Sequence, residues 1–115
     1  MAKYVLTKRA ALDLREIYNY SADQWGDIRA EKYLSDLYDA FQHMADEPQI
    51  GQFRQYRSAP FLMSPSEKHY AIYMKIEGGI AIATILHSKR DIESVISEIG
   101  EGLIAEISVI VENLI

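Results

Sequence analysis

The sequence predicts an α+β domain in which a helical hairpin packs on one face of a twisted, largely antiparallel sheet. Apolar residues recur at helical spacing in the first half of the chain, and a period-two pattern begins at Gln52. Glu77-Gly78-Gly79 then separates two apolar strands, as the turn of a tight β-hairpin would. With a strand before the helices, the expected order is β-α-α-β-β-β, a two-layer fold with four strands.

The first half is expected to hold one short strand, 3–6, followed by two helices. Thr7 suits the N-cap of the first helix, and Gly26 ends it. Pro48 and Gly51 end the second helix. Each helix has an apolar stripe, made of Ala10, Leu14, Ile17, Tyr18 and Ser21 in the first and of Ala30, Tyr33, Leu34, Leu37, Phe41, Met44 and Ala45 in the second.

The second half reads as strands. Phe53 and residues 55–57 predict one strand, and Pro60 and Pro65 predict a loop after it. The hairpin follows, with strands at 68–76 and 80–87. Since one face of each strand is apolar, the hairpin should bury one side of the sheet.

The chain divides into an expected domain at 1–96 and an apolar C-terminal extension at 97–115. Residues 91–96 are expected to start a short helix with Asp91 as its cap. In the extension Leu103, Ile104, Ile107, Ile110, Val111 and Leu114 recur at helical spacing. The segment is also rich in Ile and Val, so a strand is the competing prediction.

Composition narrows the class of protein. A chain of 115 residues without cysteine fits one domain in a reducing cytoplasm, and no apolar run reaches the roughly 18 residues of a membrane span. The net charge of -5 disfavours direct nucleic-acid binding. Between Gln52 and Ile92, however, six basic residues face three acidic ones. This mildly basic half suits an acidic protein segment at least as well as RNA.

No metal or cofactor is predicted. The three histidines, His43, His69 and His87, are far apart in sequence and lack the spacing of metal ligands on a helix.

In combination, five segments resemble the ParE toxins of the RelE/ParE superfamily of toxin-antitoxin systems. The resemblance spans about residues 4–96 and is carried by residues 4–26, AEKYLSDLYDAF at 30–41, MADEPQIG at 44–51, KHYAIYMK at 68–75 and ILHSKRD at 85–91. It implies a non-enzymatic toxin, without catalytic residues or cofactor, that inhibits DNA gyrase. It also implies a ParD-like antitoxin as partner, in a hetero-oligomer, with nucleic acid engaged only through gyrase or the antitoxin.

Five residues are the predicted contacts with gyrase or antitoxin. Charged and titratable groups gather where the last strand ends, which nothing in hairpin packing requires. Arg90 leads because its guanidinium forms paired hydrogen bonds with carboxylates. The full set is Arg90, Lys89, His87, Arg57 and Trp25.

Two alternatives stay open. A ribosome-dependent mRNA endonuclease of the RelE type would need an acid, a base and cations converging on the sheet. The residues available are Arg54, Arg57, Lys68, His69, His87 and Arg90, but no tyrosine follows Tyr73. The other alternative is an inactive homologue that only binds antitoxin.

The sheet face away from the helical hairpin is expected to be uncovered, and an antitoxin segment would dock over the sheet and hairpin. For the extension, the leading prediction is packing on this chain's own exposed sheet. Modulation of gyrase contact and self-association are the other two.

Overall fold

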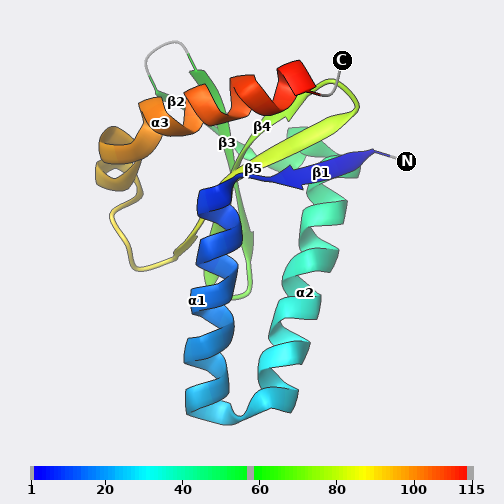
Figure 1. Cartoon of the computed structure of the whole chain (residues 1–115), viewed down its shortest axis with the longest axis vertical. Coiled ribbons are helices and arrows are strands. Elements are labelled where there is room, and N and C mark those ends of the chain that lie inside the picture. The colour runs from blue at the N-terminus through cyan, green and yellow to red at the C-terminus, as the bar shows by residue number, and fades with distance from the viewer. Residues whose placement is uncertain (1, 57–58, 114–115) are drawn as a thin grey trace.

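Three α-helices and one five-stranded sheet form the part of the chain that the computed structural model describes, residues 2–56 and 59–113 (Figure 1). The strand order is β1-β5-β4-β3-β2, with β1 parallel to β5 and the other neighbours antiparallel. The elements are β1 (Lys3–Leu6), α1 (Lys8–Trp25), α2 (Asp27–Asp46), the short 3₁₀ turn η1 (Pro48–Ile50), β2 (Gln52–Tyr56), β3 (Ala59–Ser66), β4 (His69–Ile76), β5 (Gly79–His87) and α3 (Ile92–Asn113). The predicted α+β class is confirmed.

The ends of α1 follow the local signals of the sequence. The hydroxyl of Thr7 accepts a hydrogen bond from the Ala10 amide at 3.0 Å, so Thr7 is the predicted N-cap. Gly26 has φ of 90°, a value that favours glycine, and it separates α1 from α2. The two helices form an antiparallel hairpin that extends well beyond the sheet (Figure 1).

A prediction that was wrong concerns Pro60 and Pro65, which lie in β3 and not in a loop. β3 adds a fifth strand to the four expected. Its pairing with β4 starts at Leu62, and its pairing with β2 ends at Met63. Each proline therefore lies where β3 has a single neighbouring strand, and a missing amide donor can be tolerated there.

β5 contacts both the helical hairpin and the pocket described below. β1 pairs with residues 79–82 only. Immediately beyond, Ile72 pairs with Thr84 and Tyr73 with Ile82, so Ala83 is the extra residue of a β-bulge. The bulge interrupts the alternation of side chains and brings consecutive residues of β5 toward α1.

Helices cover both faces of the sheet. On one face α1 and α2 bury a core that includes Leu14, Leu37, Phe41, Tyr73 and Ile82. On the other face α3 lies across the sheet and buries Val95, Ile96, Leu103 and Ile107 against Phe61, Met63, Ile72, Ala81, Ala83 and Leu86 (Figure 1). The expected uncovered face is therefore occupied by the chain itself, and the fold has three layers instead of two.

α3 is one continuous helix that includes the expected short helix and most of the C-terminal extension. Asp91 caps it, since its carboxylate accepts hydrogen bonds from the amide and hydroxyl of Ser94 at 3.3 and 2.8 Å. These bonds lower the pKa of Asp91. Residues 97–113 are thus helical, and the predicted packing of this segment on the chain's own sheet is confirmed. Leu114 lies outside the described residues.

Candidate functional site: a cationic pocket beside the helical hairpin

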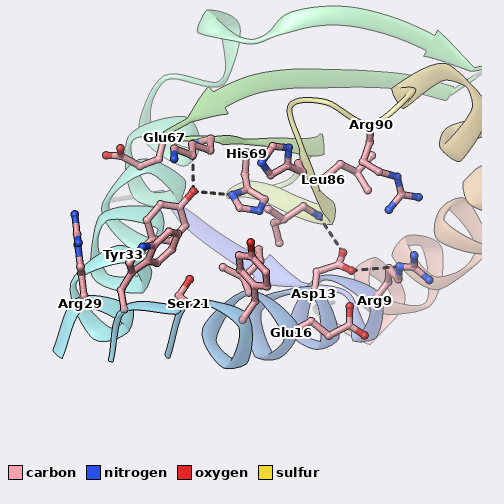
Figure 2. A pocket seen from close by; sticks show the side chains of 16 residues that line it. Arg9, Asp13, Glu16, Ser21, Arg29, Tyr33, Glu67, His69, Leu86 and Arg90 are labelled. Atoms are coloured by element: carbon pink, nitrogen blue, oxygen red, sulfur yellow. Dashed lines mark hydrogen bonds and ion pairs between the residues drawn. The ribbon is translucent and has the colours of Figure 1, made fainter. Parts of the chain in front are cut away.

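A pocket of about 620 Å³ lies between the hairpin and the adjoining ends of β4 and β5 (Figure 2). α1 and α2 supply one wall, and the start of β4 and the end of β5 supply the other. The lining residues are Arg9, Asp13, Glu16, Ile17, Tyr20, Ser21, Trp25, Arg29, Tyr33, Glu67, Lys68, His69, Ile85, Leu86, His87 and Arg90.

The wall between α1 and β5 is fixed by Asp13. One carboxylate oxygen accepts hydrogen bonds from the Thr84 hydroxyl at 2.6 Å and from the Ile85 amide at 3.0 Å. The other oxygen lies 3.4 Å from Nε of Arg9. Thr7 adds a second link, since its hydroxyl donates to the Ala83 carbonyl at 2.7 Å. Side chains of α1 thereby satisfy the edge of β5 that β1 does not reach.

Asp13 is a buried carboxylate with satisfied oxygens. Burial raises the pKa of Asp13, while the bonds from Thr84 and Ile85 and the charge of Arg9 lower it. Because each partner belongs to the wall itself, we assign Asp13 to holding the pocket together.

Tyr33 on α2 and His69 on β4 connect the two walls and point toward one another (Figure 2). The Tyr33 hydroxyl lies 2.6 Å from Nδ1 of His69 and accepts a hydrogen bond from the Lys68 amide at 3.2 Å. The imidazole of His69 meets that of His87 edge-on, with ring centroids 5.2 Å apart. Two histidines separated by 18 positions thus share one site because their strands are paired.

The protonation of His69 follows from its surroundings. Burial, and to a lesser extent the nearby His87, lower the pKa of His69 to about 4. The ring is therefore neutral near pH 7. We assign the Tyr33 hydroxyl as the donor to Nδ1 of His69, which puts the hydrogen of the neutral ring on Nε2.

The hydrogen of the His87 ring is also assigned to Nε2, on the basis of a different hydrogen bond. Its Nδ1 accepts a hydrogen bond from the Lys89 amide at 3.1 Å. Both imidazoles therefore use Nδ1 as an acceptor within the protein, which leaves an N–H group at Nε2. The pair is suited to donate hydrogen bonds and poorly suited to remove a proton.

Aromatic and cationic side chains form the rim toward the hairpin tip. The Trp25 ring, 48% exposed, has the guanidinium carbon of Arg29 at 5.8 Å and Nζ of Lys68 at 5.9 Å from its centroid. Tyr20 packs edge-on against it with centroids 6.2 Å apart. This arrangement combines an exposed apolar anchor with positive charge.

The structure brings together three of the five predicted contact residues: Trp25, His87 and Arg90 line the pocket. Lys89 is exposed beside it and contributes its amide to His87. Arg57 lies outside the described residues. The contact role of all five remains a prediction.

The residues considered for the endonuclease alternative are divided. Lys68, His69, His87 and Arg90 line the pocket, whereas Arg54 lies on β2, at the far edge of the sheet. Arg57 again lies outside the described residues. The set does not converge as one group among the residues that the structure describes.

Sequence reasoning missed the contributions of the two helices. Arg9, Asp13, Tyr20 and Tyr33 all line the pocket, although Tyr33 was expected only to pack as part of the apolar stripe of its helix. Asp13 offered one signal in the sequence, since it lies three positions after Ala10 and four before Ile17, two residues of the apolar stripe. Its partners on β5 are 71 and 72 positions away and could not be read from the sequence.

Two kinds of feature are absent from the described residues. None of their helices is long and apolar enough to cross a membrane. They also contain no group of three or more histidine, aspartate or glutamate residues placed to hold a metal ion.

Comparison with known proteins defines the class: the model of the ParE toxin of type II toxin-antitoxin systems, parDE, matches residues 4–92. Among similar proteins, Toxin ParE1 of Caulobacter vibrioides (strain ATCC 19089 / CIP 103742 / CB 15) is 30% identical over 91 residues, which cover 79% of this chain and 94% of that one. Toxin ParE of Escherichia coli is 30% identical over 95 residues, covering 80% and 90%. The chain belongs to the ParE toxin family.

Two further comparisons agree. Toxin ParE1 of Mycobacterium tuberculosis (strain CDC 1551 / Oshkosh) is 29% identical over 93 residues, covering 80% of this chain and 95% of that one. A solved structure described as the chromosomal ParDE TA system from P. aeruginosa matches with a TM-score of 0.64 and 21% identity. It covers 76% of this chain and 96% of that chain, and it shows that the fold is shared. The family match ends at the first residue of α3.

Proposed function

We propose that this chain is a toxin that inhibits DNA gyrase by protein-protein contact in the cytoplasm, and that a ParD-like antitoxin neutralises it. Membership of the ParE toxin family supports the toxin role. The proposal adds the target, the antitoxin and the absence of a catalytic step or cofactor.

One observation favours a protein-binding role of the pocket over a catalytic role. The pocket lining supplies several donors, namely the cations Arg29, Lys68 and Arg90 and the Nε2–H groups assigned to His69 and His87. Glu16 and Glu67 also line it, so its charge is mixed with an excess of cations. Donors of this kind bind carboxylates through charge-assisted hydrogen bonds. A general base in the same place would need a free imidazole nitrogen, and both Nδ1 atoms are engaged.

Gyrase supercoiling is the direct test. Purified protein should inhibit supercoiling and increase the amount of cleaved DNA held by gyrase. Arg90→Ala should weaken this inhibition by about tenfold, since the loss of one charge-assisted contact costs about 1.4 kcal/mol or more. Lys75→Ala is the matched control, because Lys75 is an exposed base on β4 outside the pocket. Undiminished supercoiling at a large excess of the protein rejects the target.

The antitoxin is tested with the product of the adjacent reading frame. Mixing the two purified proteins should give a complex in size-exclusion chromatography and should restore supercoiling. Trp25→Ala should weaken the complex, because an exposed aromatic side chain flanked by cations suits an interface anchor. Ile28→Ala is the control, since Ile28 is an exposed apolar residue of the same hairpin tip that does not line the pocket. Two separate elution peaks reject this partner.

The RelE-type endonuclease remains a second candidate because Lys68, His69, His87 and Arg90 lie together. It predicts cleavage of mRNA by the purified protein on programmed ribosomes, with loss of cleavage in His87→Gln. The inactive homologue predicts that induction leaves growth unaffected. Both are decided by the same induction experiment, in which the DNA damage response, supercoiling and message integrity are compared.

A further inference from the structure

Among the buried residues of the seam between α3 and the sheet, Leu86 alone also lines the pocket of the proposed toxin site. The helix follows the segment shared with the ParE family, since the family match ends at residue 92. It nevertheless forms a complete apolar seam with the sheet. Val95, Ile96, Leu103 and Ile107 are all at most 8% exposed.

α3 is the most acidic of the three helices. It contains five acidic residues, Glu93, Glu98, Glu101, Glu106 and Glu112, and no basic residue. The chain has 17 acidic and 12 basic residues, so the remainder holds 12 of each and is neutral. The net charge of -5 is therefore located on one amphipathic helix.

One acidic residue of α3 forms a hydrogen bond to the start of α1. The Glu106 carboxylate accepts a short hydrogen bond from the Lys8 amide, the first amide of α1. α1 has no acidic residue in its own first turn, which instead carries Lys8 and Arg9. A carboxylate is favoured at the positive end of a helix dipole. Glu106 of α3 thus provides the carboxylate that the first turn of α1 lacks.

α3 also has a weak intrinsic tendency to form a helix. Gly100 and Gly102 lie in its middle, and glycine is among the poorest helix formers. A Cβ added at Gly102 would meet no atom within 4 Å, so packing does not require glycine there. The helix consequently depends on the apolar seam for much of its stability, because most helical stability in proteins comes from the packing of an amphipathic face.

We infer that this sheet face is a helix-binding surface with α3 as its resident occupant, so that an acidic amphipathic helix of a partner protein binds there by displacing α3. The bound helix itself defines the chemistry of the competitor. It carries large aliphatic residues along one face and carboxylates on the rest. The surface shares only Leu86 with the pocket lining, and the inference holds whether or not gyrase is the target.

The test uses the full chain and a fluorescently labelled peptide with the sequence of residues 91–113. Leu103→Glu with Ile107→Glu buries two carboxylates in the seam and should release α3. The released protein should bind the peptide at least about tenfold tighter than the natural chain, because the fraction of open surface limits apparent affinity. Val109→Glu is the control, since Val109 is 54% exposed on the same helix. It should bind the peptide as the natural chain does.

A second variant should have the opposite effect and make α3 more stable. Gly102→Ala should stabilise α3 and slow hydrogen exchange of its amides by roughly three- to fivefold, with no added clash. In the natural chain these amides should exchange faster than those of β4 and β5, as expected of an element that opens by itself. Exchange of α3 only together with β4 and β5, or a folded Leu103→Glu/Ile107→Glu protein that does not bind the peptide, overturns the inference.

Discussion

The two faces of the sheet are covered by helices of different kinds. On the hairpin face, apolar packing is joined to specific polar links, with Asp13 and Thr7 bound to β5 and Tyr33 bound to His69. On the α3 face, the described contact is mainly an aliphatic seam, with Glu106 at the start of α1. Polar links fix geometry as well as adding stability, so the hairpin face can position a site. The aliphatic seam supplies burial with little directional constraint.

The difference also follows the family boundary. The hairpin and the ends of β4 and β5 lie within the matched residues 4–92, whereas α3 lies almost wholly beyond them. Relatives in the family therefore share the elements that build the pocket. α3, which covers the second face of the sheet, lies beyond the residues that the family model matches. Four predictions test how far the two faces differ, beginning with the largest expected effect.

Phe41→Ala should disrupt the hairpin face and unfold the domain as a unit. Phe41 is 0% exposed and contacts Tyr4 and Tyr38 edge-on. Truncation of a buried phenylalanine costs about 3–5 kcal/mol of unfolding free energy. Urea denaturation followed by tryptophan fluorescence measures the loss, since Trp25 lies on the hairpin. A loss below about 1 kcal/mol contradicts the view that this face holds the domain together.

Ile107→Ala should cost less, about 2–3 kcal/mol, although Ile107 is also buried. The loss of stability in Ile107→Ala cannot exceed the free energy needed to release α3 from the sheet. Once α3 has detached, the substitution has no further effect on the rest of the domain. Limited proteolysis should show cleavage within 92–113 while the remainder stays resistant. If both Phe41→Ala and Ile107→Ala sensitise the whole chain equally, the two faces form one cooperative unit.

Lowering the pH from 6.5 toward 4 should destabilise the pocket wall through His69. Its pKa in the folded protein is about 4, below the 6.5 of the unfolded chain, so the unfolded state takes up the proton first. The stability contributed by the neutral ring is fully present above pH 6.5 and is lost as the pH falls toward 4. The expected loss is on the order of 2 kcal/mol, reduced from the full shift because the ring is partly exposed.

His69→Gln retains an acceptor for the Tyr33 hydroxyl and removes the titration. Urea midpoints measured across this pH range should therefore change less for the variant than for the natural chain. Equal pH dependence of the two proteins would place the titrating group elsewhere.

Lys32→Ala sets the lower limit of the series. Nζ of Lys32 lies 2.6 Å from the Asp36 carboxylate, but the lysine side chain is 73% exposed. Exposed pairs one helical turn apart contribute about 0.3–0.5 kcal/mol, and salt screens them. Urea denaturation at low and high salt should detect a small loss that disappears at high salt. A loss above about 1 kcal/mol contradicts its assignment as a surface pair.

The sequence by itself determined the elements whose causes are local. Thr7 caps α1, Gly26 ends it, and Asp91 caps α3, because each acts on residues within a few positions. It also carried the resemblance that the family match confirms. The assignment of Pro60 and Pro65 to a loop failed because a proline is excluded from a strand only where its amide must pair. Whether a second strand stands beside it depends on register.

Only the tertiary structure decided which distant residues meet. Asp13 joins Thr84, Tyr33 joins His69, and His69 meets His87 because helix packing and strand register place them there. The same holds for α3, whose Ile- and Val-rich pattern allowed helix or strand until the apolar sheet face beneath it selected the helix. Local propensity is a free-energy difference of at most about 1 kcal/mol per residue for such side chains, and burial of a continuous seam exceeds it.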